Sequence, residues 1–147
     1  MEVRHTPLSR DDVPKKLMDQ LEAGTVSHVW FYRTDVTNTT DRPIRIIWFE
    51  GFITYNGAWV SSNIKNRVLR TTEFLQWFGG DVTAEGWLRP GGTATCHVNW
   101  HASGSSIDVT MIAKWAFIAV DAEGNDLIDR VAPGVDSSRT LAKNSTI

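Results

Sequence analysis

The stretch Thr93–Asp121, TATCHVNWHASGSSIDVTMIAKWAFIAVD, decides the fold. It contains two runs of alternating residues on either side of a small polar turn at Ala102–Ser106. Alternation with a period of two is typical of β-strands that pack one face on a core. The pattern therefore predicts a long β-hairpin. Its core-facing residues are expected to include Cys96, Val98, Trp100, Met111, Trp115 and Phe117.

The preceding part of the chain predicts further strands. Val26–Asn38 alternates in the same way, and Ile44–Tyr55 is apolar on both faces in its middle, which is typical of a central strand. Gly51 is a candidate bulge in that strand. Asn56-Gly57 favours a tight hairpin turn, so Ala58–Ser61 is expected to return antiparallel.

Two short helices are expected beside these strands. One begins near Asp12, with apolar residues spaced for one face, and Gly24 can end it. The other follows Thr72 and ends before Gly79. Residues 1–11 are expected to form a polar arm and residues 133–147 a mobile tail, because neither segment is periodic.

Strands separated by short turns, without strand–helix alternation, predict an all-β protein. We expect an antiparallel β-sandwich, immunoglobulin-like or jelly-roll-like, with one or two short helices. An open barrel is the alternative. The 147 residues suit a single domain over residues 1–147, because this length can enclose a hydrophobic core.

Composition narrows the classes of function. The net charge is −2 and the basic residues are scattered, which disfavours nucleic-acid binding. No apolar run is long enough to span a bilayer. The start of the chain lacks the apolar segment of a signal peptide, and the one cysteine, Cys96, agrees with a reducing compartment. We therefore predict a cytoplasmic protein.

The polar row on the first arm of the hairpin is the strongest candidate for a site. Its members are Thr95, His97, Asn99 and His101. Alternate residues of a strand are 6.6–6.8 Å apart, so the two histidines lie about 13 Å apart and cannot readily share one metal ion. A small hydrolase or metal-dependent enzyme using His97, His101 and Asp108 remains the alternative. No catalytic residue, metal or cofactor is assigned.

Seven tryptophans form the second signal. Trp30, Trp48, Trp100 and Trp115 lie within predicted strands and are expected in the core. Trp59, Trp77, Phe78 and Trp87 lie in the hairpin return or in irregular segments. Two or three of them exposed together would give a stacking surface for a sugar or an anchor for a protein.

These observations favour a non-catalytic binding or interaction module. Its ligand is a polar ligand, carbohydrate included, or a protein partner. The predicted ligand-binding residues are His97, Asn99, His101, Trp59, Trp77 and Trp87. A structural subunit of a homo-oligomer is a further alternative, because exposed strand edges can pair between copies.

Overall fold

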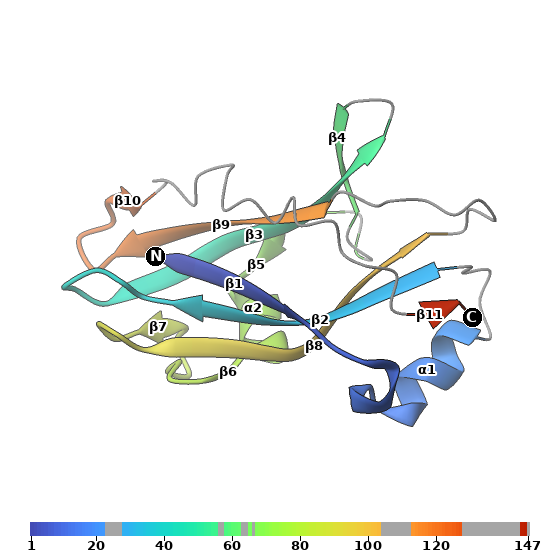
Figure 1. Ribbon diagram of the computed structural model, residues 1–147. Coiled ribbons are helices and arrows are strands. Elements are labelled where there is room, and N and C mark those ends of the chain that lie inside the picture. Colours follow the sequence, from blue (N-terminus) through green and yellow to red (C-terminus); the bar gives the residue numbers. More distant parts are fainter. Residues whose placement is uncertain are drawn as a thin grey trace.

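Two antiparallel β-sheets pack face to face in the computed structural model, with short helices at their margins (Figure 1). The structure describes residues 1–22, 28–55, 58–62, 65, 67–103, 113–127 and 145–146. Within these ranges the predicted all-β sandwich with short helices is confirmed. The described strands form two separate sheets, and these do not close into a barrel.

The first sheet is built around the pairing of β2 (His28–Thr37) with β8 (Thr93–Ser103). β1 (Glu2–Pro7) pairs with the other edge of β2, and the short β6 (Gly79–Gly80) pairs with β8. β11 (Ser145–Thr146) also pairs with β2. These two residues are the only part of the expected tail that lies within the described chain.

The second sheet is centred on β3 (Ile44–Tyr55), which pairs with β9 (Ala113–Asp121) along one edge. Along its other edge β3 pairs successively with three short strands, β7 (Trp87–Leu88), β5 (Leu69–Arg70) and β4 (Ala58–Ser61). β10 (Asp126–Leu127) pairs with the outer edge of β9. The sequence therefore identified the central strand of this sheet correctly.

The hairpin of β3 and β4 projects beyond the sandwich (Figure 1). The pairing confirms the predicted antiparallel return, while the Asn56-Gly57 turn itself lies outside the described residues. All four residues of β4 are exposed. Trp59 and Val60 are the exposed large hydrophobic residues of the described chain, at 43% and 37%.

The main core fills the space between the sheets, and Phe49 of β3 makes the most ring contacts there. Its ring centroid lies 5.5–5.9 Å from those of Phe74, Trp77, Phe78, Trp115 and Phe117. Two of these rings come from α2 (Thr71–Trp77), which connects β5 of one sheet with β6 of the other. Aromatic packing therefore ties the two sheets together through this helix.

A second, smaller core lies under α1 (Lys15–Glu22), on the outer face of the first sheet. Met18 and Leu21 of the helix are buried there with Val29 and Phe31 of β2. The helix predicted after Asp12 is thus present, preceded by a short 3-10 turn. A helix of eight residues is marginal alone, so this packing stabilises it.

The N-terminal arm expected over residues 1–11 is largely a strand, so that prediction was wrong. β1 pairs with β2 from Glu2 opposite Thr37 to Pro7 opposite Tyr32. The hydropathy of this segment hardly alternates, and the sequence pattern could not reveal it. Backbone hydrogen bonds to the edge of β2 hold it in place, and these do not depend on side-chain type.

Asn38 fastens the turn between β2 and β3. Its fully buried side chain donates to the main-chain oxygens of Arg42 (2.8 Å) and Leu88 (3.0 Å) and accepts from the amide of Thr40 (2.9 Å). Buried carbonyl oxygens need such donors, because an unsatisfied polar group keeps its full desolvation penalty. Asn38 therefore joins this turn to β7.

Replacing Asn38 with alanine is expected to lower the free energy of unfolding by about 2 kcal/mol, because the Leu88 carbonyl loses its side-chain donor, whereas Thr40 Oγ1 still donates to the Arg42 carbonyl. Chemical denaturation measures the change. The exposed neighbour serves as the control: Thr39→Ala should change the free energy by less than ~0.5 kcal/mol. A loss for Asn38→Ala as small as the control's would contradict this role.

Candidate functional site

A bulge in β8 divides the polar row that the sequence predicted. Tyr32 of β2 lies opposite Asn99, and Thr34 lies opposite Cys96. The single residue Arg33 therefore faces two residues of β8, His97 and Val98. One extra residue in a strand reverses the side to which every later side chain points.

The row consequently lies on two faces of the first sheet, and the prediction of one shared face was wrong. Thr95 and His97 lie on the outer face and line a hollow there. Asn99 and His101 turn inward and are 7% and 4% exposed. Trp100 shows the same reversal, because it packs beside the α1 cluster instead of in the main core.

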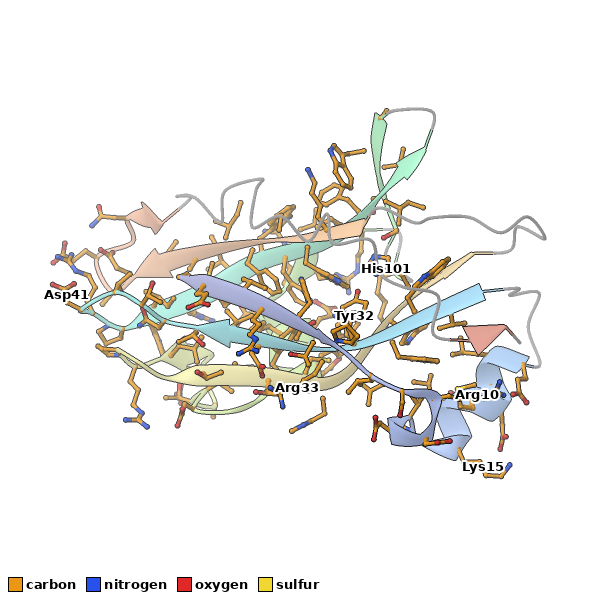
Figure 2. All side chains as sticks on the ribbon, viewed as in Figure 1. Arg10, Lys15, Tyr32, Arg33, Asp41 and His101 are labelled. Carbon is orange, nitrogen blue, oxygen red and sulfur yellow. The ribbon has the colours of Figure 1, made fainter. Side chains whose placement is uncertain are left out.

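The inward residues form a chain of hydrogen bonds between the sheets. Trp115 Nε1 donates to the Tyr32 hydroxyl at 2.6 Å, and that hydroxyl lies 2.5 Å from His101 Nδ1. His101 Nε2 lies 3.1 Å from Ser62 Oγ. Figure 2 shows Tyr32 and His101 side by side between the sheets. A second chain links His5 Nδ1, Thr34 Oγ1 and Asn99 Nδ2.

The direction of the first chain follows from its donors. The indole nitrogen of Trp115 can only donate, and His101 is the one further partner that the described residues offer the Tyr32 hydroxyl. The hydroxyl therefore donates to His101 Nδ1. A neutral imidazole then carries its proton on Nε2 and donates to Ser62. In this arrangement His101 cannot accept a proton from Ser62.

Burial keeps both interior histidines neutral. Desolvation, reinforced by the neighbouring His5, lowers the pKa of His101 to about 4. Desolvation also lowers the pKa of His5 to about 4, although the Asp35 carboxylate opposes this shift. Burial raises the pKa of the Tyr32 hydroxyl, so it remains a donor. Burial likewise raises the pKa of the Cys96 thiol to about 11, which disfavours a nucleophilic role.

The catalytic alternative gains no support from this geometry. His97 and His101 lie on opposite faces of the first sheet and cannot act on one ligand, while Asp108 lies outside the described residues. Among the residues that the structure describes, no three His, Cys, Asp or Glu side chains gather as metal ligands would. The pairing of the two histidines in one site was therefore wrong.

The outer hollow of the first sheet measures about 450 Å³ and is polar throughout. Its lining residues are Glu2, Arg4, Arg33, Asp35, Thr37, Thr93, Thr95 and His97. Asp35 accepts from Thr95 Oγ1 at 2.7 Å and from Arg33 Nε at 3.0 Å. Of the six predicted binding residues only His97 lines it.

The predicted loop tryptophans do not form one surface. Trp77 packs against the main core, where its ring meets those of Phe49 and Trp115. Trp87 and Trp59 instead lie on the outer side of the second sheet, at β7 and β4. Only these two of the three are therefore available to a partner.

A face that the sequence did not predict covers the outer side of the second sheet. Opposed residues of antiparallel strands point to the same side, and the core takes Phe49 with Phe117 and Ile46 with Ala119. The alternating residues must point outward. We call them the aromatic–arginine face: Arg45, Trp48, Phe52, Trp59, Arg70, Trp87, Lys114, Ala116, Ile118 and Val120.

A second bulge, in β3, produces this face. Ile46 lies opposite Ala119 and Trp48 opposite Ile118, so Ile47 is the extra residue. The expected core position of Trp48 was therefore wrong, since the bulge turns its side chain outward. The predicted bulge at Gly51 is also corrected, because Gly51 pairs regularly with Trp115. The aliphatic residues of β9 on this side were the available sequence signal.

Comparison with known proteins adds no family to this description. No family model matches the chain, and neither a curated protein nor a solved structure is detectably similar to it. Among the described helices, none has the length and apolar character needed to cross a bilayer. Function must therefore be argued from the faces of the two sheets.

Stability is expected to fall as the pH drops from about 6.5 toward 4. The pKa of His101 is about 4 in the folded chain, whereas an unfolded histidine titrates near 6.5. Between these values the unfolded state binds more protons, so acid favours unfolding. Above pH 6.5 the free energy of unfolding includes the full contribution of neutral His101. At pH 4 the free energy of unfolding is lower by about 3 kcal/mol on account of this residue.

Chemical denaturation at several pH values between 4 and 7 measures this dependence. His101→Gln should reduce the slope by about half, because His5 keeps its own contribution. His97→Gln, at an exposed position, is the control. A wild-type free energy of unfolding that stays constant between pH 7 and 4.5 would contradict the burial argument.

Proposed function

We propose that this chain is a protein-interaction module that binds its partner through the aromatic–arginine face. The observation that carries the proposal is the composition of that face. Trp48, Trp59, Trp87 and Phe52 lie on it with two arginines, and tryptophan and arginine are the residues most enriched at binding hot spots.

The packing of these side chains supports an outside partner. Neither core cluster of the described chain includes Trp48, Phe52, Trp87, Ile118 or Val120. They are half-buried, and Trp59 is 43% exposed. A contiguous apolar surface on a folded domain favours burial by another molecule, because water contact with it is unfavourable.

Aliphatic residues favour a protein over a sugar on this face. Ala116, Ile118 and Val120 lie along β9. Their side chains can fill pockets of a protein surface, whereas they offer a sugar no hydrogen bonds. The face therefore combines a hydrophobic centre with cationic margins, as protein interfaces do. Of the six predicted binding residues, Trp59 and Trp87 belong to this face, and the polar row of β8 does not.

Selection of a random 12-residue peptide display library against the purified protein tests the proposal. Trp59→Ala should weaken binding of the selected peptides about tenfold or more, because it removes the most exposed large hydrophobic side chain of the described residues. Its melting temperature should stay near wild type, since the ring is exposed. Fluorescence polarisation with a synthetic selected peptide measures the affinity.

Val60→Ala is a matched control for this experiment. Val60 neighbours Trp59 on β4, is similarly exposed at 37%, and pairs with Ile53 on the opposite face of the hairpin. It should leave peptide affinity unchanged. Equal losses for both variants would place binding on the hairpin as a whole, and no enrichment of any peptide would refute the proposal.

A polar small molecule, carbohydrate included, is the second candidate ligand, and the hollow of the first sheet favours it. Threonine hydroxyls and the paired Arg33 and Asp35 supply closely spaced donors and acceptors. Thermal shift with a panel of mono- and disaccharides tests this site. A stabilising sugar should lose its effect in Thr95→Ala but not in Trp59→Ala; no shift with any sugar rejects it.

A further inference from the structure

We infer that the partner presents acidic side chains to the aromatic–arginine face. This inference rests on the proposed function. Arg45, Arg70 and Lys114 lie on this face. Two acids share this side of the sheet by register: Asp126 lies opposite Val120 at its edge, and Glu50 is 4% exposed and accepts a hydrogen bond from Ser61 Oγ at 2.8 Å. The surface that a partner meets is therefore cationic as well as aromatic.

Arg45 provides the most specific evidence. Its side chain is half-buried, and its Nε is buried without a hydrogen-bond partner among the described residues. A hydrogen bond from Thr83 lowers the carboxyl pKa of Glu85, and the nearby charge of Arg45 lowers it further. Among the described residues, however, Arg45 and Glu85 do not approach closely enough to form an ion pair. A buried guanidinium nitrogen without an acceptor is costly, and an incoming carboxylate would remove that cost.

The other two cations stand beside aromatic rings. Lys114 Nζ lies 4.1 Å from the ring centroid of Trp59 and 5.5 Å from that of Phe52. Arg70 is exposed and pairs with Trp48 across the strands. Neither makes an ion pair with any residue the structure describes. Carboxylates placed among apolar side chains of a partner would complement both features.

The same charges disfavour other occupants. A second copy packed symmetrically on this face would bring three cations of each chain toward three of the other, and like charges across an interface are unfavourable. Nucleic acid needs a longer basic stripe than three residues supply, and the aliphatic side of β9 offers it nothing. An acidic protein segment is the occupant that the charges favour.

Paired peptides test the inference. A peptide from the display selection is compared with a counterpart in which every Asp is Asn and every Glu is Gln. We expect selected sequences to be rich in acidic and apolar residues, and neutralisation to weaken binding at least tenfold. Raising the salt concentration from 50 to 500 mM should weaken only the acidic peptide strongly.

Charge reversal on the protein gives the reciprocal test. Arg70→Glu should weaken binding of the acidic peptide at least tenfold and leave its neutral counterpart unaffected. Lys16→Glu, an equal change of net charge at an exposed position of α1, is the matched control and should have little effect. Equal losses in both variants would mean that only net charge matters, which would overturn the inference.

Arg45→Met separates a binding role from a structural one. Methionine keeps the apolar length and removes the buried unpaired donor, so the melting temperature of the free protein should stay equal or rise. Affinity for the acidic peptide should still fall at least tenfold. A lower melting temperature with unchanged affinity would assign Arg45 to the fold and overturn the inference.

The outcomes distinguish this inference from the proposed function. Neutral or basic peptides that bind the face and depend on Trp59 would reject the acidic partner and keep the interaction module. Failure to select any peptide would reject both. A single-stranded oligo(dT) 20-mer that binds with the same dependence on Arg70 and Trp59 would identify nucleic acid as the occupant and overturn the inference.

Discussion

Two single-residue bulges, one in each sheet, are the constraint on which the arrangement of side chains depends. The bulge at His97 and Val98 turns Asn99 and His101 into the interior, and the bulge at Ile47 turns Trp48 out of it. Each bulge reverses the side of the sheet to which the side chains beyond it point, while the strand keeps the same neighbouring strand. The interior thereby gains polar groups, while an outer face gains an aromatic ring.

The interior polar groups Tyr32, Asn99 and His101 are tolerated because each of them has a hydrogen-bond partner. Trp115, Tyr32, His101 and Ser62 form one directed chain of hydrogen bonds between the sheets. The histidine is held neutral by burial and points its proton at the serine. This chain serves the fold, and it argues against base catalysis at this position.

The outer faces of the two sheets differ in what covers them. On the first sheet, α1 buries the apolar half beside Phe31, and the remaining half is the polar hollow around Asp35. On the second sheet the described helices cover no comparable apolar patch: α2 packs its aromatic residues inward against Phe49. This asymmetry is the reason that the second sheet, and not the first, supports the proposed interaction.

Strand periodicity, turn residues and the absence of strand–helix alternation were enough to determine the sandwich and its central strand Ile44–Tyr55. The long hairpin predicted over Thr93–Asp121 was wrong, because its two arms are strands of different sheets: β8 pairs with β2, and β9 pairs with β3. Alternation gives the two sides of a strand but not which side meets a core, and an extra residue such as Ile47 leaves no trace in composition. The facing of His101 and Trp48 was therefore decided only by tertiary structure. The pairing register with the neighbouring strand decides the side to which each side chain points. The position of a bulge in that register depends on the hydrogen bonds between strands and not on local propensity.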